Sequence, residues 1–80
     1  MRIRIRVLSH FSIALGFDES SFIVPEGITF GEMKETLIDR FSTFIRPIEI
    51  GMYANMRPED DQYVLKDGDT IYIFPRSSTP

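Results

Sequence analysis

The chain has 80 residues, 42% of them apolar and seven of them phenylalanine, which suffices for one small hydrophobic core. It contains no cysteine, and this excludes disulfides, thiolate metal sites, iron–sulfur clusters and cysteine nucleophiles. The net charge of −3 disfavours nucleic acid as a partner held by bulk electrostatics. The first residues alternate charged and apolar side chains, unlike a signal peptide or a membrane span, so we expect a cytoplasmic protein without a membrane partner.

The first 27 residues predict two strands separated by a loop. Ile3, Ile5 and Val7 alternate with three arginines, which is the pattern of a half-buried strand. Residues 9–18 include Ser9, His10, Gly16 and Asp18, and these polar and glycine residues predict a loop. A second short strand follows in "SFIVPEG", where Ile23 would point to the face opposite Phe22 and Val24; Pro25 and Gly27 end this strand.

The clearest helix covers about residues 30–41. Thr29 is a suitable N-cap, and Glu32, three residues later, completes a capping box. Ile28 and Met33 occupy the two positions of a hydrophobic staple. One apolar stripe runs along this helix and predicts the helical side of the core: Phe30, Met33, Leu37, Ile38 and Phe41.

The remainder of the chain predicts two further strands, and residues 63–65 are a candidate for a short additional one. In "IEIGMYAN", Ile48, Ile50, Met52 and Ala54 are in phase for a third strand. Asp67-Gly68-Asp69 forms a tight turn before the last strand, in which Ile71 and Ile73 point inward. We therefore predict an α+β fold of the β-grasp type. It has a mixed four- to five-stranded sheet packed on one main helix, one domain over residues 1–75 and a flexible tail over residues 76–80.

Residues with catalytic potential are few. His10 is the only histidine, and it falls in a predicted loop. The acidic runs "EDD" and "DGD" lack the spacing of a calcium loop, and the glycines fit neither a phosphate loop nor a dinucleotide fingerprint. We therefore expect no enzyme activity, no metal and no cofactor.

An exposed sheet face is the better candidate for function. In a β-grasp sheet the first and last strands are central, so one face would carry arginine, tyrosine, phenylalanine and isoleucine, which are residue types suited to interfaces. The alternative is that arginine stems stack on aromatic rings as ordinary surface cover. The predicted partner-binding residues are Arg4, Arg6, Ile23, Tyr53, Tyr72 and Phe74.

The sequence resembles the MoaD/ThiS group of ubiquitin-like sulfur carriers. The features that carry the resemblance are "VPEGITFGEM" at the helix start, Ala54-Asn55 after the third strand, and "LKDGD" before a strand that ends in Phe74-Pro75. Together they extend from Arg2 to Pro75, almost the whole chain. The resemblance implies docking on a protein partner, either a molybdopterin-synthase large subunit or an activating enzyme.

The C-terminal tail departs from this family. Members of the family end in Gly-Gly, whose carboxylate is adenylated and converted to a thiocarboxylate, and side chains at these positions would obstruct the narrow channel that the tail enters. Here the tail is Arg76, Ser77, Ser78, Thr79 and Pro80. The β-branched Thr79 and the ring of Pro80 do not suit such a channel, so we expect no thiocarboxylate.

Three other readings remain open. The chain could be a functional sulfur carrier for molybdopterin or thiamine biosynthesis, although it contains no internal Gly-Gly. It could also be a module like the TGS domain, which carries similar "LKDGD" turns. Finally, three arginines with two aromatic residues could contact nucleic acid, namely Arg2, Arg4 and Arg6 with Tyr72 and Phe74.

Overall fold

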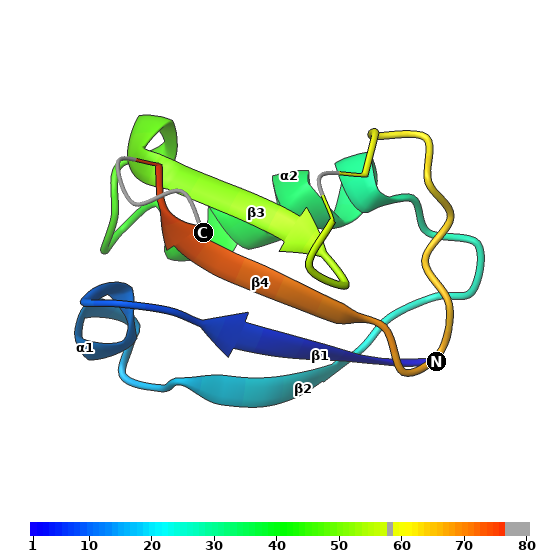
Figure 1. Ribbon diagram of the computed structural model, residues 1–80, viewed down its shortest axis with the longest axis horizontal. Helices are drawn as coiled ribbons and strands as arrows, with labels where there is room; N and C mark the ends of the chain where they lie inside the picture. Colours follow the sequence, from blue (N-terminus) through cyan, green and yellow to red (C-terminus); the bar gives the residue numbers. More distant parts are fainter. Residues whose placement is uncertain (58, 77–80) are drawn as a thin grey trace.

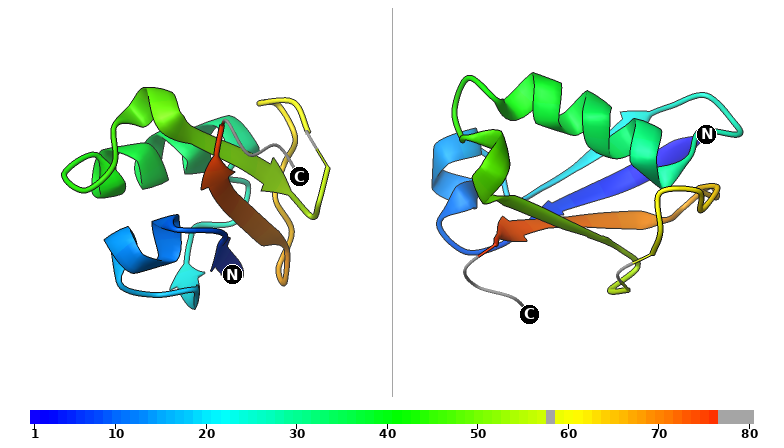
Figure 2. Two further views of the ribbon diagram at one scale, coloured as in Figure 1. Left: turned by 60° about the vertical axis from the view of Figure 1, so that its left-hand side comes forward. Right: turned by 90° about the horizontal axis from the view of Figure 1, so that it is seen from above.

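The computed structural model describes residues 1–57 and 59–76, which form one sheet covered on one face by one long helix (Figure 1, Figure 2). The elements in chain order are β1 (Arg2–Val7), α1 (Phe11–Leu15), β2 (Glu19–Ile23), α2 (Phe30–Phe41), the 3-10 helix η1 (Pro47–Glu49), β3 (Ile50–Ala54) and β4 (Thr70–Pro75). The mixed sheet and the main helix confirm the predicted β-grasp arrangement.

The sheet has four strands in the order β2-β1-β4-β3. Strands β1 and β4 pair in parallel at the centre, although they come from opposite ends of the sequence. Strands β2 and β3 pair antiparallel with them and form the two edges. The register places Arg6 beside Tyr72 and Tyr72 beside Tyr53.

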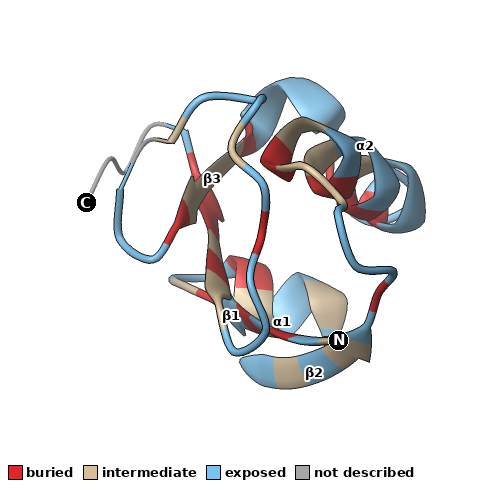
Figure 3. Cartoon of the chain, turned by 90° about the vertical axis from the view of Figure 1, so that its right-hand side faces the viewer, coloured by how far each residue is buried: buried red, intermediate tan, exposed pale blue. Residues whose placement is uncertain are grey.

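The core lies between α2 and the inner face of the sheet, where Figure 3 shows the buried residues of both layers facing one another. Alternate residues of β1 are buried, and α2 contributes the stripe that its sequence predicted, except that Ile38 is only partly buried. The largest side chains below 2% exposure are Phe30, Ile3, Ile5, Met33, Leu37, Ile71 and Ile73.

Helix α2 begins at the residue that the capping box predicts. The Thr29 hydroxyl accepts a hydrogen bond from the Glu32 N–H at 3.2 Å, and Glu32 Oε1 accepts one from the Thr29 N–H at 3.0 Å. The next two amides of the helix are satisfied by the loop that follows β3, since Phe30 N–H donates to the Tyr63 carbonyl and Gly31 N–H to the Asp61 carbonyl. The cap and this loop therefore hold the start of α2 in place.

The region between β1 and β2 is not the plain loop that its polarity predicted. It contains the five-residue helix α1, whose Phe11 is buried and whose Leu15 packs partly against the core. Gly16 ends α1 with φ of 83°, and its N–H donates to the Ser12 carbonyl. A short apolar i, i+4 pair followed by glycine was the available signal, but so short a helix depends on the contacts that it makes with the core.

Two strand boundaries also differ from the sequence prediction, and one candidate strand does not form. Strand β2 spans Glu19–Ile23 and ends before Val24. Strand β3 begins only at Ile50, because Pro47 starts the 3-10 turn η1 and leaves Ile48 75% exposed. Residues 63–65 form no strand; Val64 makes one isolated bridge with Thr29.

Candidate docking surface

The outer face of the sheet carries a row of tyrosine and arginine side chains across three strands. Tyr53, Tyr72 and Arg6 are lateral neighbours on β3, β4 and β1. Both tyrosines are half-buried and Arg6 is exposed. The structure therefore brings these three predicted residues together, and Arg4 lies two residues from Arg6 on the same face.

Glu19 of β2 extends this row and was not predicted. Its carboxylate lies 3.6 Å from Arg6 Nη1 and 3.9 Å from Arg4 Nε. All three side chains are about half exposed, so these ion pairs orient the two arginines and add little stability. Glu19 stands directly opposite Arg6 in the antiparallel register, and such a neighbour cannot be identified until the pairing of the strands is known.

Phe74 is buried, and the expectation that it would be largely solvent-exposed is wrong. It does point to the outer face, out of phase with Ile71 and Ile73, but its side chain is only 5% exposed. The ring lies over Gly51 of β3, where an added Cβ would come within 2.5 Å of Phe74 Cε2. Tyr53 packs edge-to-face against it, with the ring centroids 4.8 Å apart.

Gly51 is therefore the residue that determines the environment of Phe74. A glycine within a strand pattern indicates a close approach by another group, and this signal was present in the sequence. The partner in that approach, the Phe74 ring, depends on the register between β3 and β4. Phe74 thus packs against Tyr53 on the outer face and, being buried, contributes little contact area of its own.

The other predicted residues lie apart from this row. Ile23 is 73% exposed on edge strand β2, in agreement with its predicted orientation. Arg76 is hydrogen-bonded to the sheet: its N–H donates to the Glu49 carbonyl and its Nε to the Ile50 carbonyl. The remaining tail residues, Ser77, Ser78, Thr79 and Pro80, lie outside the described residues.

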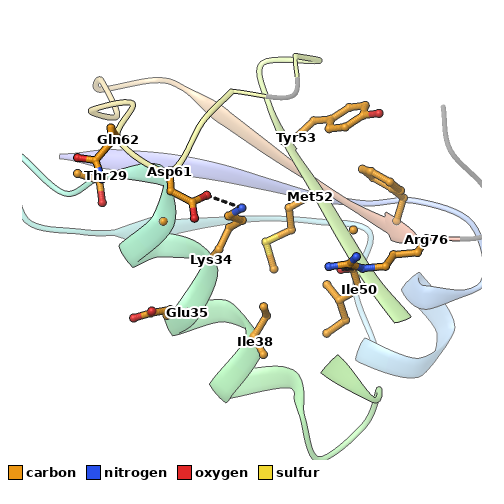
Figure 4. Close-up of a pocket in the computed structure, with 13 residues that line it drawn as sticks. Thr29, Lys34, Glu35, Ile38, Ile50, Met52, Tyr53, Asp61, Gln62 and Arg76 are labelled. Carbon is orange, nitrogen blue, oxygen red and sulfur yellow. Dashed lines mark hydrogen bonds and ion pairs between the residues drawn. The ribbon is translucent and has the colours of Figure 1, made fainter. Parts of the chain in front are cut away.

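A groove of about 720 Å³ runs between α2 and β3 (Figure 4). Lys34 and Asp61 form an ion pair of 2.6 Å within it, and the Lys34 ammonium also lies 4.8 Å from the centre of the Phe30 ring. Ile38 and Met52 line its apolar part. The Lys34–Asp61 pair thus links α2 to the loop that covers its start.

Two titratable groups of the described residues, Glu32 and Tyr63, have shifted pKa values, and both take part in structural contacts. Hydrogen bonds from the backbone and then the side chain of Thr29 lower the pKa of Glu32. The hydrogen bond from the Tyr63 hydroxyl to Asp69, 2.9 Å long, raises the pKa of Tyr63. Asp69 Oδ2 also accepts a hydrogen bond from the Lys66 N–H, so the "DGD" segment is a turn stabilised by hydrogen bonds.

The described residues were compared with the requirements of a metal site, a histidine-based site and a membrane span. Within residues 1–57 and 59–76, no three His, Cys, Asp or Glu side chains are arranged to hold a metal ion. His10 Nδ1 lies 3.4 Å from Ser9 Oγ, but both groups are exposed neighbours in sequence. None of the described helices has the length and apolar content that a bilayer-spanning segment needs.

Comparison with known proteins identifies the fold. No family model matches the chain, and no curated protein matches it in sequence. The molybdopterin converting factor subunit 1 from Pyrococcus furiosus matches with a TM-score of 0.78 and 23% identity, over 94% of this chain and 97% of that one. The small archaeal modifier protein 1 of Haloferax volcanii matches with a TM-score of 0.71 and 13% identity, over 92% and 95%.

A ubiquitin from Caldiarchaeum subterraneum also matches, with a TM-score of 0.68 and 16% identity over 100% of this chain and 98% of that one. These structures establish the ubiquitin-like β-grasp fold for the described residues. They include the MoaD-like group that the sequence resembles, together with small protein modifiers.

Proposed function

We propose that this protein is a non-catalytic, ubiquitin-like binding module that docks on a protein partner through the outer face of its sheet. The partner would be a molybdopterin-synthase large subunit or an activating enzyme, in a cytoplasmic pathway of sulfur transfer or molybdopterin synthesis. The fold it shares with a molybdopterin converting factor subunit supports this class of partner.

The observation that carries the proposal is the row formed by Tyr53, Tyr72 and Arg6. Tyrosine and arginine are enriched at the energetic centres of interfaces, because both bury large areas and still offer hydrogen-bond donors. Tyr53 is held in place by its edge-to-face contact with the Phe74 ring, and the two tyrosines by their cross-strand pairing. The arginines are oriented by Glu19. Such pre-organisation lowers the entropy lost when a partner binds.

Binding can be tested by calorimetry with purified samples of the two candidate partners that are encoded in the same genome. Tyr72→Ala should weaken binding by about 2 kcal/mol, or roughly 30-fold, if the row is the centre of the interface. Arg6→Ala should also weaken it, whereas Arg46→Ala is a matched control, since Arg46 is exposed and lies outside the sheet. Unchanged affinity of both Tyr72→Ala and Arg6→Ala would refute docking through this face.

We propose further that the protein is not thiocarboxylated. The support is that no two glycines are adjacent anywhere in these 80 residues, so trimming could not expose Gly-Gly. The chain can be incubated with ATP, a sulfur donor and the activating enzyme, and its intact mass measured. An exchange of oxygen for sulfur at the terminus would instead identify it as a functional sulfur carrier, the alternative reading.

A further inference from the structure

Strand β2 has an open edge along its full length. Val7 N–H donates to the Asp18 carbonyl, and Val24 N–H donates to the Met1 carbonyl, so the hydrogen-bonded pairs of β1 and β2 involve the even-numbered residues of β2. In an antiparallel ladder the alternate residues direct their N–H and C=O groups away from the partner strand. These residues are Glu19, Ser21 and Ile23, and no hydrogen bond to a described residue involves their backbone.

The opposite edge of the sheet is largely closed. On β3 the odd-numbered residues form the backbone hydrogen bonds with β4, as Asn55 does with Thr70 and Glu49 with Arg76. The backbone N–H and C=O groups of Ile50, Met52 and Ala54 therefore point away from β4. Arg76 Nε covers the Ile50 carbonyl, and Ala54 exchanges both of its backbone hydrogen bonds with Arg57. Natural sheets commonly protect their edges in this way, by a bulge, a charge or a covering segment. Strand β2 has no comparable backbone cover among the described residues.

We propose that β2 pairs with β2 of a second copy of this chain, antiparallel and centred on Ser21. In this register Ser21 faces Ser21 of the other copy, and Glu19 faces Ile23 in both directions. The free backbone N–H and C=O groups of Glu19, Ser21 and Ile23 in each copy can then form hydrogen bonds with the other copy. These bonds join two four-stranded sheets edge to edge. The contact uses the same surface on both copies, so it is closed by a two-fold axis.

The side chains favour this register over its neighbours. On the outer face, Glu19 would lie between its own Arg6 and the uncharged Ile23 of the second copy, so no like charges face each other. A register centred on Glu19 would oppose two carboxylates, and one centred on Ile23 would leave Glu19 unpaired. On the inner face, Phe22 would lie beside the small Ser20 of the other copy. Phe22 is only partly buried in one copy and lies 5.0 Å from the Arg40 guanidinium.

This pairing should be weak and should stop at two copies. A five-residue strand pair buries less than the roughly 800 Å² per partner of a standard stable interface, so we expect a dissociation constant of about 0.1–1 mM. Because the β3 edge is covered by Arg57 and Arg76, it offers no second long edge for further strand addition. The prediction is therefore a concentration-dependent dimer without higher assemblies.

Sedimentation velocity over about 20 µM to 2 mM tests the proposal, since this range spans the expected dissociation constant. The wild-type protein should shift from monomer to dimer, and Ser21→Pro should weaken the dimer at least about 10-fold because it removes the central outward N–H of each copy. Circular dichroism should show the fold unchanged, as proline is tolerated where an edge N–H faces solvent. A wild-type protein that stays monomeric at 2 mM would overturn the proposal. The β2 edge would then be open for pairing with an extended segment of another protein.

A pair of charge variants tests the register without altering the backbone. Ser21→Lys and Ser21→Asp each place two like charges at the axis, so each variant alone should dimerise about 5-fold more weakly than the wild type. An equimolar mixture should restore dimers, because opposite charges then meet. Gln62→Lys is the matched control for charge, since Gln62 is exposed in the loop at the far side of the sheet, and it should leave dimerisation unchanged. Dimerisation unaffected by Ser21→Lys, or a mixture that does not pair, would contradict this register.

Discussion

The two faces of the sheet bury their aromatic and aliphatic side chains in different ways. The inner face is covered by α2, and Ile71 and Ile73 of β4 are fully buried there. The outer face has no covering element among the described residues, yet Phe74 of the same strand is almost as buried, because Gly51 of β3 leaves room for its ring. Side chains on the inner face are thus buried because α2 covers the sheet, whereas Phe74 on the outer face is buried because Gly51 has no side chain. A residue that alternates away from the core can still contribute to stability.

The largest effect should come from the inner face. Ile73→Ala should lower the free energy of unfolding by about 3 kcal/mol, since Ile73 has no exposed surface and its loss leaves a cavity that α2 cannot fill. Urea denaturation followed by circular dichroism measures this. If Ile73→Ala lowered the free energy of unfolding less than Phe74→Ala does, the inner face would not be the more important of the two for stability.

Substitutions on the outer face should lower the free energy of unfolding less, and those at Phe74 and Gly51 should depend on each other. Phe74→Ala should cost about 2 kcal/mol, because the ring is buried but borders the open groove beside β3. Gly51→Ala should cost about 1–3 kcal/mol, because the new methyl group meets the Phe74 ring.

In the Phe74→Ala background the Gly51→Ala change should be neutral or stabilising, because the space is then empty and alanine suits a strand better than glycine. A double-mutant cycle of urea unfolding experiments gives the coupling energy between these two residues. Additive losses would show that the ring and the glycine act independently, contrary to their contact in the structure.

The helix that covers the inner face should be sensitive to acid through its cap. The pKa of Glu32 is lowered in the folded state, so its carboxylate stabilises the fold above the ordinary pKa of 4.5, and this contribution is lost as the pH falls through the folded value. The stability difference between the wild type and Glu32→Gln should therefore shrink between pH 7 and about pH 3. Parallel urea titrations measure it; a constant difference would contradict the role of the charge.

The smallest effect should be at the exposed ion pairs of the outer face. Glu19→Gln should change the free energy of unfolding by no more than about 0.5 kcal/mol, because Glu19 and both arginines remain about half exposed to solvent. Thermal unfolding is sufficient to measure it. A loss above about 1 kcal/mol would place this network among the contacts that stabilise the fold.

Local patterns predicted the helix better than they predicted the outer face. The start of α2 at Thr29 could be predicted because both hydrogen bonds of the capping box join residues three positions apart. The orientation of Ile23 followed from strand alternation. The burial of Phe74 could not be predicted, because it depends on the absence of a side chain 23 positions earlier, on another strand. Helix α1 was missed for a related reason, since five residues have little intrinsic tendency to form a helix.

The parallel pairing of β1 with β4 has a consequence for how the chain folds. The central pair of the sheet joins residues 4–7 with residues 70–73, so the middle of the sheet is the contact that closes the longest loop. The hairpin-like pair of β1 and β2 can form early, but β3 has no strand to pair with until β4 arrives. A chain truncated before residue 70 would lose the centre of its sheet and leave two unconnected edges. Folding should therefore be slow for a chain of this size and should be completed only when its last strand is available.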